Sequence, residues 1–355
     1  MGNNDSGKPE RARRYDDKKP DARRLAAVAK ELVAIVHGAD DSRPVLSALS
    51  FPELSTRTGF SDALDLFGYN YRENFYDEDH RRFPKTAIFG SENGHAPSAW
   101  QAVLDRPFIA GQFLWTGIDF LGECRGWPIR ISQAGILDLC GFPKPLYYQR
   151  KALWTTEPFV KLAVCKGTKE QSIPWTDTFL YDAQPGETVC VCVYTNAPAA
   201  TLYLNGTSLG EQTRTPGDEC RLLWEFPFEP GTLTATAGNV SDTLSTPGKS
   251  TFLSLEPYSS PIQTDASIVQ ILVSLQDENG VLCAGDDREI HFQLRGDGAL
   301  LGIENGKPDD LTPYSEPYRS TFGGRAIVYL RKNSPDTPLE LFAYTKDGIS
   351  ALLRV

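Results

Sequence analysis

Two short apolar runs in this sequence lead into residue types that do chemistry. The runs are Thr86–Phe89 and Phe108–Phe113. The residues that follow them are Ser91, Glu92 and His95 after the first run, and Trp115, Asp119 and Glu123 after the second. A carboxylate beside an aromatic platform at the end of a strand is typical of sites that bind and cleave sugars.

The elements that must position these residues alternate along the chain. The predicted strands are Arg43–Leu49, Ala63–Tyr69, Thr86–Phe89 and Phe108–Trp115, and the predicted helices are Asp21–Val36, Asp77–Phe83 and Ala96–Leu104. Strands that alternate with helices lie parallel, and a (β/α)8 barrel builds its active-site face from the residues at their carboxyl ends.

Four parallel strands amount to half of such a barrel. The outer strands of a half barrel would expose unpaired backbone groups and apolar faces. We therefore expect either that the chain is a fragment, the interpretation we favour, or that another chain completes the barrel. Open strands also predict self-association. The polar segment Met1–Asp21 is expected to be a loop.

From about Trp154 the pattern changes to short β-branched runs separated by Gly, Pro, Asn and Asp. This alternation is typical of immunoglobulin-type sandwiches, in which Tyr194 and Trp224 are expected to be core residues. The predicted fold class is multidomain α/β plus all-β. Residues 1–153 would form the second half of a TIM barrel, residues 154–248 one immunoglobulin-like β-sandwich and residues 249–355 a second.

Composition argues against several classes of partner. The net charge of −10 argues against nucleic acid and anionic membrane surfaces. No run is long enough to span a membrane, and Met1–Pro20 lacks the apolar core of a signal peptide. The 7 cysteines have no zinc-like spacing and fit buried thiols better than a disulfide framework. We expect no metal and no cofactor.

Six motifs in order resemble glycoside hydrolase family 2, in its β-galactosidase-like branch. They are Arg43-Pro44, GYNY at 68–71, GSENGH at 90–95, FLWTGIDFLGE at 113–123, GILDLCGFPKPLYY at 135–148 and YTNAPAATLYLNGTSLG at 194–210. The resemblance covers nearly the whole chain. It implies the second half of the family's catalytic barrel followed by two C-terminal immunoglobulin-like domains.

The resemblance also implies roles for the residues at the strand ends. Glu92 matches the family's nucleophile, and Tyr69 or Tyr71 would donate a hydrogen bond that favours its charged form. The residues matched to substrate binding or to the rim of the site are Asn70, His95, Trp115, Asp119 and Glu123. Alternatives remain open: Glu92 as a carboxylate at a helix N-terminus, His95 as a structural residue and Trp115 as a core residue.

One departure from the family pattern concerns the general acid/base. A retaining glycosidase needs a second carboxylate about 5 Å from the nucleophile, and the family places it as a Glu after Gly-Asn. Here the chain begins MGNND. Either Asn4 is a degenerate acid/base position, or the motif lies upstream of Met1. Asn cannot donate a proton to a leaving alkoxide.

The function implied by the family is retaining hydrolysis of a terminal β-linked sugar, a β-galactoside, with little activity expected from this chain alone. Uronate-specific members carry an Asn-x-Lys pair near the active site, and none stands near Glu92, which disfavours a glucuronidase. The rival hypothesis is a non-catalytic carbohydrate-binding or interaction protein that uses the sandwiches. Family habit implies a periplasmic or extracellular location for the full-length protein.

Overall fold

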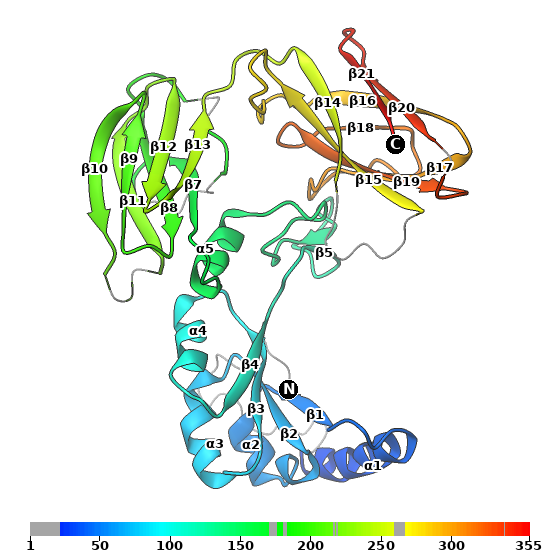
Figure 1. The fold of residues 1–355 in the computed structure, drawn as a ribbon. Coiled ribbons are helices and arrows are strands. Elements are labelled where there is room, and N and C mark those ends of the chain that lie inside the picture. Colours follow the sequence, from blue (N-terminus) through cyan, green and yellow to red (C-terminus); the bar gives the residue numbers. More distant parts are fainter. Residues whose placement is uncertain are drawn as a thin grey trace. The chain divides into compact units, whose positions relative to one another are not determined.

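The computed structural model describes residues 22–169, 176–179, 183–215, 217, 219–258, 267–336 and 338–355. Met1–Asp21, with the suspected acid/base position Asn4, lies outside the described residues. The chain divides into two compact units, which meet in the sequence between Gly117 and Ile118. Figure 1 colours the chain from blue in the first unit to red at the C-terminus.

The first unit is built on one open four-stranded sheet, with strands in sequence order (Figure 1). Its strands are β1 (Leu46–Leu49), β2 (Leu66–Asn70), β3 (Ile88–Asn93) and β4 (Ile109–Leu114). Its helical segments are α1 (Arg23–Ala39), α2 (Pro52–Arg57), η3 (Ser61–Ala63), η4 (Glu73–Phe75), α3 (Tyr76–Arg82) and α4 (Pro97–Leu104). All three strand pairings are parallel. The predicted alternation of strands and helices is confirmed, and so is the parallel arrangement expected from it.

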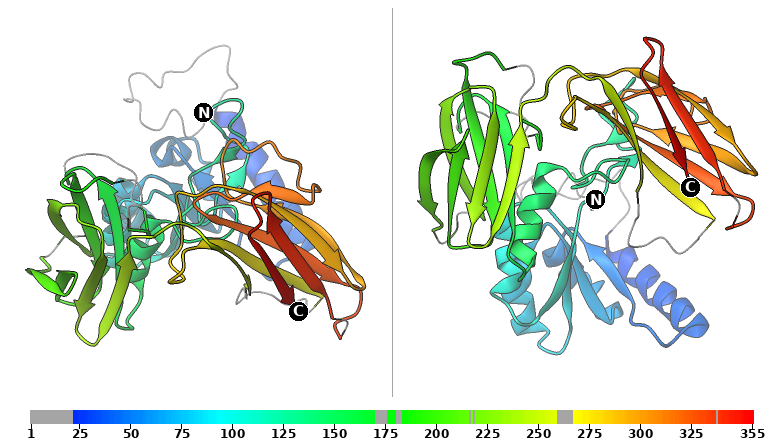
Figure 2. Two further views of the ribbon diagram at one scale, coloured as in Figure 1. Left: turned by 90° about the horizontal axis from the view of Figure 1, so that it is seen from above. Right: turned by 45° about the horizontal axis from the view of Figure 1, so that its top comes forward.

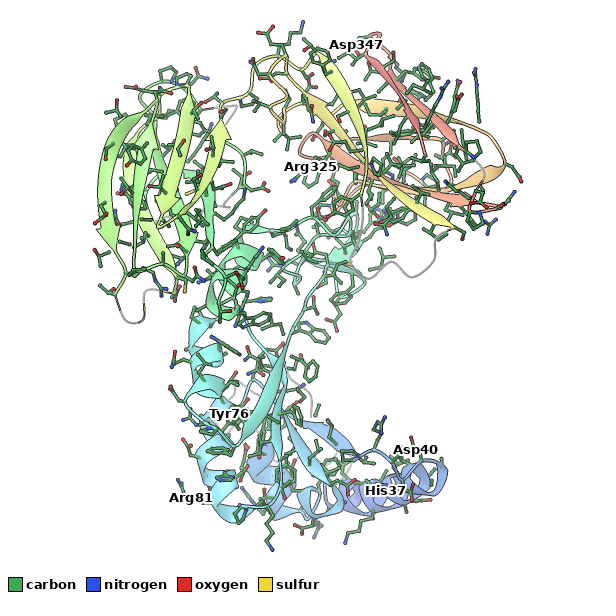
Figure 3. The ribbon with its side chains drawn as sticks, viewed as in Figure 1. His37, Asp40, Tyr76, Arg81, Arg325 and Asp347 are labelled. Atoms are coloured by element: carbon green, nitrogen blue, oxygen red, sulfur yellow. The ribbon has the colours of Figure 1, made fainter. Side chains whose placement is uncertain are left out.

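Aromatic rings dominate the core of this unit. Phe67 and Tyr69 of β2 meet Phe83 and Tyr76 edge to face, at centroid distances of 5.1 and 5.6 Å. Such pairs add about 0.5–1.5 kcal/mol beyond the burial of their area. Tyr76, labelled in Figure 3, is fully buried. The side of β2 that carries these rings is therefore fixed against the core.

Helix α1 is amphipathic as predicted, but its apolar face is largely open. Ala29 is buried, whereas Leu25, Leu32 and Ile35 are each more than half exposed. Near the end of the helix, His37 Nε2 lies 2.8 Å from Asp65 Oδ2 (His37 is labelled in Figure 3). The helix is thus tied to the unit at its carboxyl end.

The second unit opens with a segment that carries little regular structure. β5 (Phe120–Leu121) and β6 (Ile131–Ser132) pair antiparallel, and α5 (Pro145–Trp154) follows. Pro145 stands at the first helical position, where its missing N–H costs nothing. Ala152 of α5 packs with Cys192 and Tyr194 in one apolar cluster. This contact covers the outer face of the sheet that follows in the sequence. The central strand of that sheet is therefore buried on both faces.

Two antiparallel sheets follow and pack face to face as a β-sandwich. One is ordered β10-β9-β12-β13 and the other β11-β8-β7. Their strands are β7 (Val160–Lys166), β8 (Thr188–Thr195), β9 (Ala199–Leu204), β10 (Thr207–Thr213), β11 (Arg221–Pro227), β12 (Thr232–Ala237) and β13 (Val240–Ser245). Leu202 and Leu233 from one sheet share a core with Val191 and Trp224 from the other. Tyr194 and Trp224 are buried, as expected.

A second sandwich completes the chain (Figure 2). Its sheets are ordered β14-β15-β19-β17 and β18-β16-β20-β21. Their strands are β14 (Phe252–Pro257), β15 (Ile268–Gln276), β16 (Glu289–Arg295), β17 (Gly298–Glu304), β18 (Tyr318–Ser320), β19 (Arg325–Lys332), β20 (Glu340–Thr345) and β21 (Ser350–Arg354). Val273 and Val328 of the first sheet pack with Ile290 and Leu341 of the second. The all-β prediction for this half of the chain is confirmed.

The cysteines and helices bear on two further expectations. All the cysteines are unpaired thiols, buried except for the exposed Cys124. Within the described parts of the chain, no helix has both the length and the apolar character that crossing a membrane requires.

The segment before α5 docks on the second sandwich around a buried carboxyl group. Cys140 and Phe142 share an apolar cluster with Ile327 of β19. Asp138 Oδ1 accepts hydrogen bonds from the backbone N–H groups of Cys140 (2.8 Å) and Phe142 (2.9 Å). The guanidinium of Arg325, labelled in Figure 3, lies 4.9 Å from the Phe142 ring centroid. Burial raises the pKa of Asp138 to about 6, although these hydrogen bonds and Arg325 oppose the shift.

We expect Asp138→Asn to stabilise the protein at neutral pH. Because the folded-state pKa is raised, the folded protein binds the proton more tightly than the unfolded chain. The group's stabilising contribution is complete below its ordinary value of 3.8 and is lost as the pH rises through about 6. Asn keeps an acceptor oxygen and carries no charge, so the variant should gain roughly 1–3 kcal/mol over the wild type between pH 4 and pH 7.5.

Urea unfolding of both proteins at several pH values measures this gain. Asp309→Asn, at an exposed position of the same unit, is the matched control. A stability difference between Asp138→Asn and the wild type that stays constant with pH would show that folding does not raise the pKa of Asp138.

Candidate active site

The carboxyl ends of three neighbouring strands bring the predicted site residues together. β2 ends at Asn70 and continues into Tyr71, β3 carries Glu92, and Trp115 follows the end of β4. The N–H of Tyr71 donates to the carbonyl of Glu92 (2.8 Å), and the N–H of Trp115 donates to the carbonyl of Asn93 (2.9 Å). The parallel ladder therefore extends beyond the strands and fixes the backbone of the site.

Glu92 is held by a hydrogen-bond donor on each carboxylate oxygen. The Tyr71 hydroxyl donates to Oε1 at 2.9 Å, and the Asn70 side-chain amide donates to Oε2. Two donors fix the plane of the carboxylate. Glu92 lies within β3, and α4 begins only at Pro97, so the alternative role as a helix N-terminal carboxylate is wrong.

Asn70 is oriented in turn by Ser91. The Ser91 hydroxyl donates to Asn70 Oδ1 at 2.8 Å, so the amide nitrogen of Asn70 must face Glu92. Asn70 is only 4% exposed. It was predicted to bind substrate, but the structure directs its amide to Glu92. The orienting role of Ser91 was not predicted from the sequence. The sequence feature that could have indicated this role is the position of Ser91 next to Glu92.

A glycine makes this arrangement possible. A β-carbon at Gly68 would lie 2.6 Å from Ser91 Oγ, so a larger residue there would displace the Ser91 hydroxyl. The glycine of the GYNY motif therefore serves a close approach between β2 and β3.

Tyr71 adopts a backbone conformation that bulky residues rarely show. Its φ is 55°, in the left-handed region. This conformation costs of order 1–3 kcal/mol and persists where the surroundings impose it, which is common at functional sites. Here this backbone conformation occurs in the residue whose hydroxyl donates to Glu92.

Tyr69, the other predicted donor, is not bonded to Glu92. Its ring is 1% exposed, and its hydroxyl donates to Asp79 Oδ2 at 2.6 Å. Burial raises the pKa of both Tyr69 and Asp79. Tyr69 and Tyr71 have different partners because β2 ends at Asn70, and Tyr71 leaves the strand with a positive φ. Tyr69 belongs to the scaffold.

His95 and Trp115 lie at the same edge of the sheet as Glu92. His95 is half-buried in the segment between β3 and α4. Trp115 is 37% exposed, so the alternative of a core residue does not describe it. An exposed ring next to a carboxylate-bearing strand is compatible with the predicted stacking platform.

Asp119 and Glu123 belong to the second unit and have different surroundings. Asp119 is 4% exposed, and its Oδ1 accepts bonds from the Gly135 N–H and from Lys144 Nζ, both at 2.8 Å. It holds the segment before α5 together and is not open to a sugar. Glu123 is exposed between β5 and β6, with a φ of 44°.

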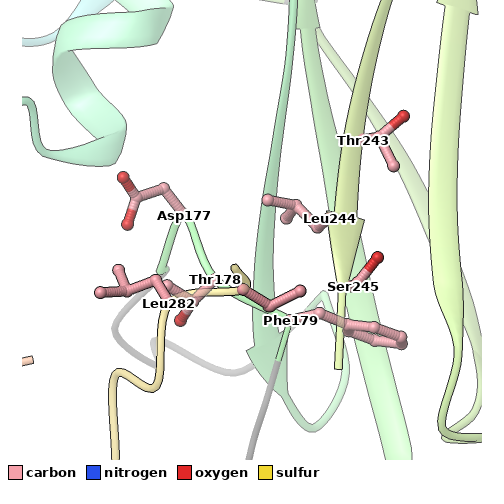
Figure 4. A pocket seen from close by; sticks show the side chains of 8 residues that line it. Asp177, Thr178, Phe179, Thr243, Leu244, Ser245 and Leu282 are labelled. Carbon is pink, nitrogen blue, oxygen red and sulfur yellow. The ribbon is translucent and has the colours of Figure 1, made fainter. Parts of the chain in front are cut away.

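Neither of two cavities in the described part of the second unit is lined by Glu92 or its neighbours. One of about 270 Å³ is lined by residues that include Asp177, Phe179, Leu244 and Leu282 (Figure 4). The other, of about 300 Å³, lies beside α5 at Tyr147 and Trp154.

Comparison with known proteins bears on the family resemblance. Residues 253–351 match the glycoside hydrolase family 2 C-terminal domain 5, and residues 186–241 match a domain of unknown function (DUF4982). The β-galactosidase BoGH2A of Bacteroides ovatus is 28% identical over 383 residues, which cover 92% of this chain and 43% of that protein. Over most of its length the chain is similar to proteins of glycoside hydrolase family 2. It is also 31% identical over 249 residues to a putative β-glucuronidase of Formosa agariphila, covering 65% of this chain and 22% of that one.

Solved structures of family 2 proteins share this fold. A family 2 member from Bacteroides cellulosilyticus superposes with a TM-score of 0.85 at 25% identity, over 94% of this chain and 48% of that one. A β-glycosidase from Bacteroides vulgatus gives a TM-score of 0.75 at 22% identity, over 93% and 49%. The chain therefore spans under half the length of the relatives it matches.

Asp79→Ala should destabilise the first unit by about 1–3 kcal/mol, because the buried Tyr69 hydroxyl loses its acceptor. Asp79→Asn keeps an acceptor and buries no charge, so we expect a loss below about 1 kcal/mol. Urea unfolding with hydrogen exchange of β2 amides measures both. In a Tyr69→Phe background the cost of Asp79→Ala should largely disappear, and an undiminished cost would mean that the pair does not interact.

Proposed function

We propose that this chain carries the nucleophile side of a retaining β-glycosidase site, with Glu92 as nucleophile and a terminal β-linked galactose as substrate. The observation that carries the proposal is the carboxylate of Glu92, bonded by Tyr71 at 2.9 Å and by Asn70 at the open end of a parallel sheet. The identity to a β-galactosidase supports the sugar.

The geometry suits both steps of a retaining reaction. In the first step a Glu92 oxygen attacks the anomeric carbon, and the aglycone leaves with a proton from a second carboxylic acid. Charge leaves the carboxylate as the ester forms. In the second step water attacks the anomeric carbon and gives a proton to the second carboxylate, while the bond between the sugar and Glu92 breaks. The charge returns to Glu92, so its two donors stabilise it as the leaving group.

His95 and Trp115 are proposed to bind the sugar at the same edge, through its hydroxyl groups and its apolar face. Glu123 is proposed to contribute to the rim. The proposed roles of Asn70 and Tyr71 are to position Glu92. The acid/base is assigned either to position 4, where Asn4 would be a degenerate form, or to a residue before Met1.

The architecture proposed for the whole is the second half of a (β/α)8 barrel followed by two immunoglobulin-like sandwiches, with boundaries near residues 153 and 248. The parallel order β1-β2-β3-β4 and the two antiparallel sheet pairs support it. Residues 118–153 group with the sandwiches by contact, so their assignment to the barrel rests on the family resemblance.

A β-galactoside is preferred over a β-glucuronide on the sequence near Glu92. An Asn-x-Lys sequence does occur at Asn305–Lys307, but Asn305 is 1% exposed in the second sandwich. Its amide donates to Asp310 Oδ2 and to the carbonyl of Ser320. It is therefore engaged in the sandwich core. The non-catalytic alternative has less support, because the named relatives are glycosidases.

Covalent labelling tests the nucleophile directly. A 2-deoxy-2-fluoro-β-galactosyl fluoride needs a nucleophile but little help from an acid, so it should add its glycosyl mass to the peptide that carries Glu92. Glu92→Gln should abolish labelling, whereas Glu53→Gln, a half-buried carboxylate on α2, should not change it. Asn70→Ala should slow labelling roughly 10²-fold, because the nucleophile loses its orientation.

The experiment uses this chain and the product of its complete open reading frame. Labelling of another carboxylate would overturn the assignment of Glu92. Labelling by the corresponding glucuronyl fluoride alone would leave the nucleophile standing and refute the galactose.

We further propose that the isolated chain self-associates through its first unit. β1 and β4 are edge strands, and the apolar face of α1 is exposed. Open edges of this kind recruit partners. Sedimentation should show oligomers for residues 22–355 and not for residues 154–355, and a monomeric longer chain would contradict the proposal.

A further inference from the structure

Aromatic rings gather on the outer face of one sheet in the second sandwich. Tyr318 of β18, His291 of β16 and Tyr344 of β20 are direct cross-strand neighbours, with centroids 5.5 and 5.3 Å apart. Phe342 stacks on Tyr344 at 5.5 Å. Leu352 of β21 lies opposite Phe342 and is 56% exposed. We call these five side chains the aromatic patch.

The patch faces away from the sandwich core. The alternate residues Ile290, Phe292, Leu341 and Ala343 are buried in the shared core, and successive side chains of a strand point to opposite faces. The patch side chains must therefore face outward, and all five keep exposed surface. The hairpin turn with Asp347, labelled in Figure 3, marks the end of this sheet.

The other sandwich shows that such rings are not required for sheet stability. The outward positions of its sheet β10-β9-β12-β13 include Thr201, Thr234 and Thr243, with Tyr203 as the aromatic residue of these strands. A concentration of rings on one outer face is therefore a specific feature of the second sandwich, and exposed apolar patches mark binding surfaces.

Closed ion pairs border the patch. Lys346 Nζ lies 2.6 Å from Glu289 Oε1, and Arg354 Nε lies 2.8 Å from Glu340 Oε1. His291 Nε2 lies 2.9 Å from the same Glu289 oxygen. The opposite charges of these two pairs cancel, so the pairs add little net field that would attract a charged polymer. The chemistry fits a neutral ligand that offers both apolar faces and hydroxyl groups.

We propose that the aromatic patch binds a neutral glycan chain at a site separate from Glu92. The choice of a glycan rests on the proposed function, since a polymer held here would keep substrate close to the enzyme. Sugar rings present apolar C–H faces to aromatic rings and hydroxyl groups to side chains such as Gln293, which is exposed beside Phe342. Tyr318 lies on an edge strand, where one side of its ring has no neighbour within the patch.

Affinity electrophoresis of the full chain tests this, with β-1,4-galactan or barley β-glucan in the gel and polygalacturonate as the anionic comparison. We expect retention by a neutral polymer. Tyr344→Ala, at the centre of the patch, should weaken it about tenfold. Tyr344→Trp should stay within roughly threefold of the wild type, because it restores an aromatic surface. Tyr203→Ala is the matched control and should bind as the wild type does.

Three results would overturn the inference: no retention of the wild type in either neutral polymer, retention in polygalacturonate alone, or equal retention of Tyr344→Ala. Sedimentation of the wild type as a dimer that Tyr344→Ala dissociates would assign the patch to a second copy instead. Glu92→Gln should not alter retention. Labelling at Glu92 without retention refutes only the patch, whereas retention without labelling refutes only the proposed nucleophile.

Discussion

The parallel pairing of β2 with β3 is the constraint on which the candidate site depends. Asn70 and Glu92 are register partners in this pairing. The backbone bond from Tyr71 to Glu92 continues the ladder past the strand ends. Side chains from two segments 21 or 22 residues apart thus meet without a flexible loop between them. Any change that separates these strands, such as a larger residue at Gly68, would remove both donors from the carboxylate.

Three successive residues at the end of β2 have three different tasks. Tyr69 faces the core and is bonded to Asp79, Asn70 faces Ser91 and Glu92, and Tyr71 leaves the strand with a positive φ. Pleated strands send neighbours to opposite sides, so one short strand can anchor itself and present a donor. The buried hydrogen bond between Tyr69 and Asp79 thus supports the positions of Asn70 and Tyr71.

The second unit follows the same rule that buried polar groups need partners. Asp119 and Asp138 each accept backbone N–H bonds that close the segment before α5. Arg319 is fully buried, 3.2 Å from Asp310 and 4.9 Å from the centroid of the Tyr314 ring. Such groups cost free energy when left unpaired, so they favour one docking arrangement over others.

Much of this organisation is readable in the sequence. Alternating apolar runs and helical periodicity predicted the four strands, their parallel order and the change to all-β structure near Trp154, because these patterns have periods that local geometry enforces. The motif around Glu92 identified the carboxylate. The tertiary structure alone decided which neighbour serves it: Tyr71 and not Tyr69, with Asn70 as donor and Ser91 as its orienting partner. It also showed that Asp119 is an internal anchor and that side chains of four separate strands form the aromatic patch. Those choices depend on register and on which face a side chain takes, and only the pairing of strands distant in the sequence fixes them.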